Sequence, residues 1–202
     1  QGAVFGLGDL DRSMARRVFN PGGLVAVWAE ENTRESIFAG LKRREVYATS
    51  GPRISVRLSA NAQGEALSCA ANHASPADVS MGGDFQQAQG APSFKVHAQA
   101  DQTPLQEMEI IKGQYRNGKY EESVTSVWQR SNTGSDVCQI WRDQNFDPNA
   151  PAFWYARIKQ AATPRWSANL CQKAGRCEDF PGADVMIQER AWTSPIWYLP
   201  EQ

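Results

Sequence analysis

Residues 50–59 read Ser-Gly-Pro-Arg-Ile-Ser-Val-Arg-Leu-Ser, and the pattern of the chain changes within this stretch. Before it, the spacing of apolar residues is helical. After Ser50-Gly51-Pro52, apolar and polar residues alternate, as in a β-strand with one buried and one wet face. The same alternation returns in residues 94–98, Phe-Lys-Val-His-Ala. This change of period indicates a mainly β region that begins near residue 55.

Further short strands are expected downstream. Turn signals separate several runs of β-forming residues, which predicts an antiparallel, β-sandwich-like region. We expect loops over residues 60–92, a turn over Gly113–Gly118, and an irregular segment over 160–186. The further strand candidates are residues 108–112, 122–130, 137–142 and 152–159.

A strand–helix unit is expected upstream. The apolar run at residues 24–29, Leu-Val-Ala-Val-Trp-Ala, follows a Pro-Gly-Gly turn and predicts a buried strand. Asn32 followed by Glu35 is typical of a capping box, so a helix is predicted over residues 33–45. We therefore divide the chain into residues 1–54, the strand–helix segment, and residues 55–202, the sandwich-like domain with an irregular tail.

The composition of the chain argues against a nucleic-acid partner and against a membrane span. The chain has 202 residues, is 41% hydrophobic, and carries 21 basic and 22 acidic residues, for a net charge of −1. Because phosphate binding needs a concentrated basic surface, we expect no nucleic-acid partner. No run approaches the roughly 20 apolar residues of a membrane span.

The four cysteines, an even number, are Cys69, Cys138, Cys171 and Cys177. In an exported protein they predict two disulfides, and Cys171 and Cys177 are close enough in sequence to close a small ring. Four unpaired thiols in a cytosolic protein are the alternative. The spacings do not fit a zinc site, so no metal ligand is assigned.

Catalytic motifs are missing from the sequence, which has no nucleophile elbow, zincin motif or phosphate-binding loop. His73 and His97, the only histidines, are too few for a His-rich metal cluster. The aromatic group around Trp154, together with Arg165 and Trp166, could stack on a sugar, although such aromatic residues more often fill a core.

Longer motifs carry a family resemblance. Residues 22–38 and 41–54, Met81-Gly-Gly-Asp84, Ala156-Arg157, Thr163–Trp166 and Ile187–Tyr198 resemble a bacterial family of unknown function that is allied to the PHP (polymerase and histidinol phosphatase) metallohydrolases, carbaryl-hydrolase-like members included. The resemblance covers nearly the whole chain. It implies that residues 1–54 are the last strand–helix unit of a PHP-type α/β barrel.

The resemblance also implies a hydrolase that holds divalent metals through an N-terminal G-D-x-H-x-H-like motif. Here Gly8-Asp9 is followed by Leu-Asp, so the ligand set does not carry over. We therefore expect a non-catalytic C-terminal portion of a periplasmic or secreted hydrolase, inactive alone and prone to self-association, that completes or covers an N-terminal catalytic region.

Five residues near the strand–helix unit are expected to face the cleft of that region: Glu30, Arg34, Tyr47, Thr49 and Arg53. The simpler interpretation of Glu30 is support of the helix dipole, and that of the residues from 47 to 53 is a turn with satisfied hydroxyl groups. The alternative functions are a carbohydrate- or ligand-binding sandwich module that uses exposed tryptophans, and a truncated product with a function of its own.

Overall fold

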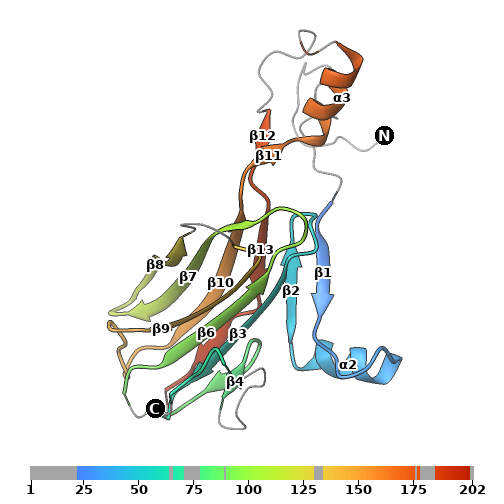
Figure 1. Ribbon diagram of the computed structural model, residues 1–202. Coiled ribbons are helices and arrows are strands. Elements are labelled where there is room, and N and C mark those ends of the chain that lie inside the picture. The colour runs from blue at the N-terminus through green and yellow to red at the C-terminus, as the bar shows by residue number, and fades with distance from the viewer. Residues whose placement is uncertain are drawn as a thin grey trace, which may run out of the picture.

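The computed structural model describes residues 22–63, 66–70, 78–88, 90–129, 134–175, 177 and 185–200. This part of the chain is mainly β, with two helices and three sheets of eight, four and two strands. Two of the sheets form the body of the molecule, and a small arm projects from it (Figure 1). The mainly β fold predicted from the alternating pattern is confirmed.

The four-stranded sheet has the order β4-β3-β6-β9 and is antiparallel throughout. Its strands are β3 (Ser55–Asn61), β4 (Val79–Ser80), β6 (Ser93–Gln99) and β9 (Asp136–Arg142). The alternation seen in the sequence explains the faces, because Val56, Leu58, Phe94 and Val96 are at most 1% exposed. The predicted strands at 54–58, 94–98 and 137–142 are thus confirmed.

The eight-stranded sheet is organised around β10 (Ala152–Gln160). β7 (Leu105–Arg116) pairs with one edge of β10 and continues to β8 (Lys119–Gln129). The other edge of β10 pairs with β13 and then with β14, both antiparallel. The remaining strands are β1 (Leu24–Val27), β2 (Val46–Thr49), β5 (Asp84–Phe85), β13 (Arg190–Thr193) and β14 (Ile196–Tyr198).

The two large sheets pack face to face and enclose the core. Trp154 of β10 lies at its centre, fully buried, and the ring of Phe94 from the small sheet packs against it in a tilted arrangement, 4.9 Å away between ring centroids. The core also holds a buried ion pair between Lys112 and Asp143, whose charged atoms are 2.8 Å apart. Asp143 accepts a hydrogen bond from the Trp154 indole at 3.1 Å, so the charge is held by fixed partners.

The strand–helix unit differs from the prediction in three ways. β1 is not buried: Val25 is 77% exposed, because β1 is the edge strand of the large sheet. It pairs antiparallel with β2, and β2 pairs with β13, so the described residues form an open sheet here rather than a closed barrel. The helix α2 (Arg34–Lys42) is capped by Thr33, whose hydroxyl accepts from the Ser36 N–H, and not by Asn32.

The expected boundary at residue 54 falls between β2 and β3. Since β2 pairs with β13, strands from both sides of that boundary share one sheet. The boundary itself stays a prediction.

Three expected irregular regions contain regular structure. Residues 160–186 include β11 (Thr163–Pro164) and α3 (Trp166–Ala174), and β11 pairs with β12 (Met186–Ile187). These elements form the arm that projects from the sandwich (Figure 1). The expected loops at 60–92 contain β4 and β5. The expected turn at 113–118 is limited to Asn117 and Gly118, where φ is 51° and 75°, so β7 runs four residues further than expected.

Candidate functional site

A hollow of about 340 Å³ lies where the arm leaves the sandwich. This volume is at the low end of the range for small-molecule sites. Its walls come from the start of the described chain, the turn after β2, and the base of the arm. The lining residues are Gly22, Gly51, Pro52, Thr163, Pro164, Arg165, Trp166, Ile187 and Glu189.

The turn wall of the hollow is held by hydrogen bonds to the strand that leads back from the arm. The Ser50 N–H donates to the carbonyl of Arg190 at 2.9 Å, and the Ser50 hydroxyl donates to the carboxylate of Glu189. The Gly51 N–H donates to the hydroxyl of Thr49 at 3.3 Å. These bonds fix the turn against the base of the arm, so the hollow is a defined feature of the fold.

The arm wall carries a cation and an aromatic ring. The backbone N–H of Arg165 donates to the carbonyl of Val185 at 2.8 Å, and Thr163 pairs with Ile187. These contacts join the two strands of the arm. Trp166 begins α3 and is 40% exposed. The two residues suggested by the sequence as ligand contacts, Arg165 and Trp166, therefore share this wall.

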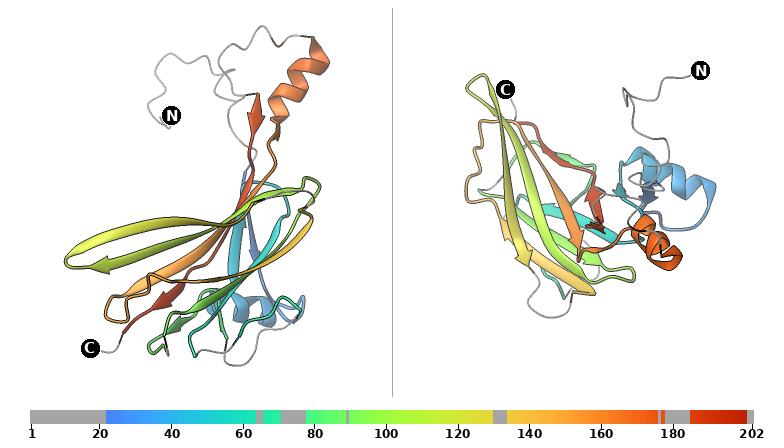
Figure 2. Two further views of the ribbon diagram at one scale, coloured as in Figure 1. Left: turned by 60° about the vertical axis from the view of Figure 1, so that its left-hand side comes forward. Right: turned by 90° about the horizontal axis from the view of Figure 1, so that it is seen from above.

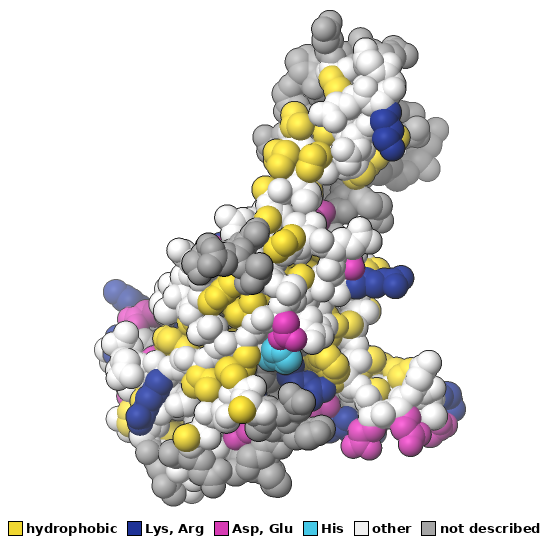
Figure 3. Space-filling model, in the orientation of Figure 1, with side chains coloured by type: hydrophobic (Ala, Val, Ile, Leu, Met, Phe, Trp, Pro, Cys, Tyr) yellow, Lys and Arg dark blue, Asp and Glu magenta, His cyan; other side chains and the backbone are white. Residues whose placement is uncertain are grey.

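Exposed apolar side chains lie on two units on this side of the molecule, the β1–α2 unit and the arm. On the β1–α2 unit these are Leu24, Val25, Phe38 and Leu41, and on the arm they are Trp166, Leu170, Val185 and Met186; each is at least 40% exposed. Viewed from above, α3 and the β1–α2 unit lie on the same side of the sandwich (Figure 2). The space-filling view shows apolar side chains on the surface of the arm (Figure 3). We call these eight residues and the hollow the arm-side surface.

The five predicted cleft residues do not gather in one place. Glu30 and Arg34 are exposed at the α2 end of the β1–β2 pair, whereas Thr49 and Arg53 lie at the opposite end, next to the hollow. Tyr47 lies between them in β2, with its ring 5.9 Å from that of Trp28, and burial raises the pKa of its phenol. Their expected role in a cleft stays a prediction.

Thr49 and Arg53 have structural roles at the turn. Thr49 is 4% exposed and accepts from the Gly51 N–H, while the Arg53 N–H donates to the Asp101 carboxylate at 2.9 Å. The simpler expectation for this segment, a turn with satisfied hydroxyl groups, describes Thr49 well. Arg53 itself is exposed.

Trp154 is not available to a ligand. Its indole is 0% exposed, donates to Asp143, and packs against Phe85 and Phe94. Because side chains alternate along a strand, Trp154 faces the core while its neighbours Phe153 and Tyr155 lie on the other face of β10. The expected ligand-stacking role is therefore wrong for Trp154.

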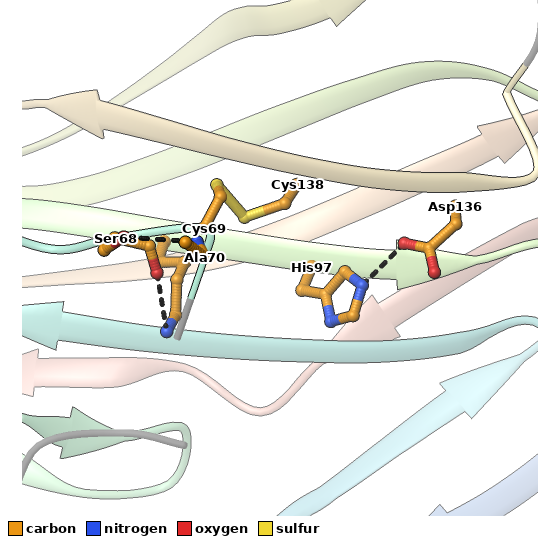
Figure 4. Close-up of a disulfide and its surroundings, with 7 residues drawn as sticks. Ser68, Cys69, Ala70, His97, Asp136 and Cys138 are labelled. Carbon is orange, nitrogen blue, oxygen red and sulfur yellow. Dashed lines mark hydrogen bonds and ion pairs between the residues drawn. A yellow bond between two sulfur atoms is a disulfide. The ribbon is translucent and has the colours of Figure 1, made fainter. Parts of the chain in front are cut away.

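Both predicted disulfides are present, Cys69–Cys138 and Cys171–Cys177. The first ties the segment at Ser68–Ala70 to β9 on the outer face of the small sheet (Figure 4). Nearby, His97 pairs with Asp136 at 2.7 Å. Hydrogen bonds from Gln99 and from His97 lower the pKa of the Asp136 carboxyl. Paired cysteines are typical of oxidising compartments outside the cytosol. His73 lies outside the described residues.

An ion-pair cluster on the outer face of the large sheet was not expected from the sequence. Glu109 is buried and meets Arg157 at 2.6 Å and Lys159 at 2.7 Å, and Lys159 also meets Glu107 at 3.1 Å. Burial alone would raise the pKa of the Glu109 carboxyl, but hydrogen bonds from Arg157 and Lys159 outweigh it and lower that pKa. The signal was present in the sequence, since these residues alternate with core residues along β7 and β10.

The described residues include no group of three or more His, Cys, Asp or Glu side chains placed to hold a metal ion. In the same part of the chain, neither helix is long and apolar enough to cross a membrane.

Among the comparisons with known proteins, a match is found to one protein family. No curated protein matches the chain, and no solved structure matches it. A family model described as a protein of unknown function, DUF3604, matches residues 8–137 and 125–200, which together cover most of the chain. The chain therefore belongs to the DUF3604 family.

Proposed function

We propose that this chain is a non-catalytic accessory region that docks through its arm-side surface onto the catalytic region of a metal-dependent hydrolase. The observation that carries the proposal is the concentration of exposed apolar side chains on that surface. Val25 is 77% exposed, Phe38 58% and Leu170 57%. Exposed apolar groups that gather on one side of a soluble protein often mark an interaction site.

The edge position of β1 adds to the same argument. An edge strand presents unpaired backbone N–H and C=O groups on its outer side, and proteins usually protect such edges with charge or cover. β1 instead reads Leu-Val-Ala-Val and carries no charged residue. A partner element that pairs with or covers β1 would satisfy both its backbone groups and its side chains.

The identity of the partner rests on the sequence resemblance. Residues 22–54, which include β1, α2 and β2, resemble the closing segment of a PHP-like catalytic domain. In this proposal the divalent metals and the activated water belong to the partner region, which is part of the same longer polypeptide or a separate chain. Glu30, Arg34 and Arg53 are the predicted cleft residues that a docked partner could reach, because all three are exposed.

The proposed compartment is the periplasm or the extracellular space. The two disulfides support it, since such bonds persist in oxidising environments.

Co-expression with a tagged catalytic region from the same family tests the docking. We expect a complex that survives affinity purification and that Val25→Lys or Leu170→Lys weakens, because each places a charge in an apolar contact. Ile140→Lys is the matched control: Ile140 is 43% exposed but lies on the small sheet. No complex, or one that all three variants weaken equally, would contradict the proposal.

Elemental mass spectrometry of the purified chain tests the non-catalytic part. We expect no stoichiometric zinc, manganese or iron. One or more metal ions per chain would mean that residues of this chain form a metal site, and hydrolase assays on the chain alone would then be the next step.

A further inference from the structure

A second surface, remote from the arm-side surface, carries a row of aromatic rings. On the outer face of the large sheet, Trp197 of β14 lies directly opposite Phe153 of β10, and Phe153 lies opposite Gly113 of β7. On β8, Glu122 lies opposite Gly113, and the hydroxyl group of Tyr120, two residues before it, approaches Gly113. Aromatic rings from β14, β10 and β8 thus lie close together on this face of the sheet.

Gly113 explains how the rings are arranged. A Cβ atom at this position would lie only 2.5 Å from Cε1 of Phe153 and 2.8 Å from the hydroxyl oxygen of Tyr120. The missing side chain therefore lets the tip of the Phe153 ring lie close to the backbone of β7. Glycine in a strand interior often marks such a close approach.

The neighbouring rings extend this arrangement into a platform. Tyr120 and Tyr155 are nearly parallel to Phe153, with interplanar angles of 18° and 15° and ring centroids 6.4 and 6.5 Å away. The three rings therefore share nearly the same orientation. Trp197 adds a tilted ring 5.0 Å from Phe153. We call Tyr120, Phe153, Tyr155 and Trp197 the aromatic platform.

A shallow hollow of about 200 Å³ lies at the end of the platform, and its exposed lining is almost entirely apolar. It includes Tyr115 and Leu199, which are 55% and 47% exposed. The volume is below the 300–1,000 Å³ of typical drug-sized pockets, so the hollow would hold about one six-membered ring.

Polar groups surround these rings. The Tyr120 hydroxyl donates to the Glu122 carboxylate at 3.0 Å, which leaves acceptor capacity on both groups. The hydroxyls of Tyr115 and Tyr155 and the indole N–H of Trp197 make no hydrogen bond within the described part of the chain. An apolar floor with separate donors and acceptors at its edge is the usual design of a small-molecule site.

We propose that the aromatic platform binds a neutral saccharide, with sugar rings lying flat on Phe153, Tyr120 and Trp197. A pyranose has an apolar C–H face that complements the electron-rich face of an aromatic ring, and its hydroxyl groups point outward from its rim. The aromatic platform would contact the apolar C–H face of the sugar, and the surrounding Tyr, Trp and Glu122 groups would hydrogen-bond to its hydroxyl groups. This inference concerns a different surface from the proposed docking and does not depend on it.

The charges around the platform exclude a phosphate-bearing ligand. Glu121 and Glu122 lie on the same hairpin, and the nearby Arg116 is already paired with Glu121 at 3.1 Å. Nucleic-acid binding needs a concentration of unpaired cations, which this hairpin lacks in the described residues.

Isothermal titration of the full chain against three neutral oligosaccharides tests the inference: cellohexaose, maltohexaose and the hexamer of N-acetylglucosamine. We expect at least one to bind, with a Kd between the micromolar and low millimolar range. Tyr120→Ala should weaken that binding at least about fivefold through loss of one stacked ring. Because Tyr120 is 56% exposed, this variant is expected to fold normally.

Gly113→Ala distinguishes a flat platform from a generally apolar patch. The added methyl group would lift the Phe153 ring without removing any aromatic group, so we expect a loss of binding similar to that of Tyr120→Ala. Trp192→Ala is the matched control, because Trp192 pairs with Arg157 beside the ion-pair cluster and not with the platform. Circular dichroism of each variant confirms folding.

Three outcomes would overturn the inference. They are no binding of any of the three saccharides, binding that Trp192→Ala weakens as much as Tyr120→Ala, and concentration-dependent dimers that Tyr120→Ala abolishes while no saccharide binds. The last result would assign the platform to a protein contact. None of them bears on the docking experiment, which uses residues on the other surface.

Discussion

The interior of the sandwich and the arm-side surface both contain large apolar side chains, but the interior buries them and the arm-side surface exposes them. In the interior, Trp154 is 0% exposed and even the Lys112–Asp143 ion pair has its partners within the chain. On the arm-side surface, Val25 and Leu170 are 77% and 57% exposed. The interior is completed by this chain, so it sets stability. The arm-side surface exposes apolar area that the described residues do not bury, so its effects should appear in association instead.

The largest loss of stability is expected from breaking the interior ion pair. Asp143→Ala leaves the Lys112 ammonium buried without a counter-charge and removes the acceptor of the Trp154 indole. We expect a loss of about 3–5 kcal/mol in the free energy of unfolding, measured by urea denaturation. Asp84→Ala is the control, since Asp84 pairs with Arg44 at 3.7 Å on the surface; its loss should stay below about 1 kcal/mol.

A double variant sharpens that prediction. Lys112→Met combined with Asp143→Ala removes both charges, so part of the lost stability should return. If the double variant is less stable than Asp143→Ala alone, the unpaired charge is not the cause of the loss.

One disulfide lies in the body of the molecule and the other in the arm, so removing each of them tests a different part. Cys69–Cys138 spans 69 residues and anchors the small sheet, so Cys69→Ser with Cys138→Ser should cost about 4 kcal/mol of unfolding free energy by the chain-entropy model. Cys171–Cys177 spans six residues within the arm. Its removal should leave the urea midpoint of the sandwich nearly unchanged and speed proteolysis of the arm. If removing either disulfide lowered the urea midpoint by the same amount, the arm and the sandwich would unfold as one unit.

A smaller, pH-dependent contribution is expected from Glu109. Its pKa is lower in the folded protein than its usual 4.5, so its stabilising effect is complete above that value and is lost as the pH falls through the folded-state pKa. Glu109→Gln should cost about 1–2 kcal/mol at pH 7, from the loss of charge-assisted hydrogen bonds. The difference from the wild-type protein should shrink as the pH falls below about 4.5.

Glu35→Gln provides the comparison for this titration, because Glu35 is exposed in the first turn of α2. Its stability difference from the wild type should stay within about 0.5 kcal/mol. If the Glu109→Gln difference keeps its size down to pH 3, the carboxylate charge does not contribute to stability in the way described.

The positions of the strands were predicted from the sequence better than the burial of their side chains. The alternation at residues 54–58 and 94–98 specified both strands and their core faces, because a period of two assigns alternate residues to opposite sides. The run at 24–29 was correctly a strand but wrongly a buried one. Apolar composition indicates that a face prefers cover, and it does not say whether the cover lies in the same chain.

The same limit applies to the candidate sites. Trp154 lies on the opposite face of β10 from Phe153 and Tyr155, and which face is the core depends on pairing with β7, which is more than 35 residues away. The helix α3 was missed because its N-cap, Arg165, makes no side-chain capping bond and Pro164 precedes it. The hollow is lined by residues 22, 51–52, 163–166, 187 and 189, and no local sequence pattern relates these segments.

The smallest effect on stability, and the most informative for function, is expected on the arm-side surface. Val25→Lys should change the free energy of unfolding by less than about 0.5 kcal/mol, because a side chain that is 77% exposed loses little burial when replaced. The same variant should reduce self-association of the isolated chain in sedimentation velocity, since a charge opposes apolar contact between copies. Ile140→Lys, on the small sheet, should leave self-association unchanged. A loss of 2 kcal/mol or more in Val25→Lys would place β1 within the chain's own core, and the contrast between interior and arm-side surface would then fail.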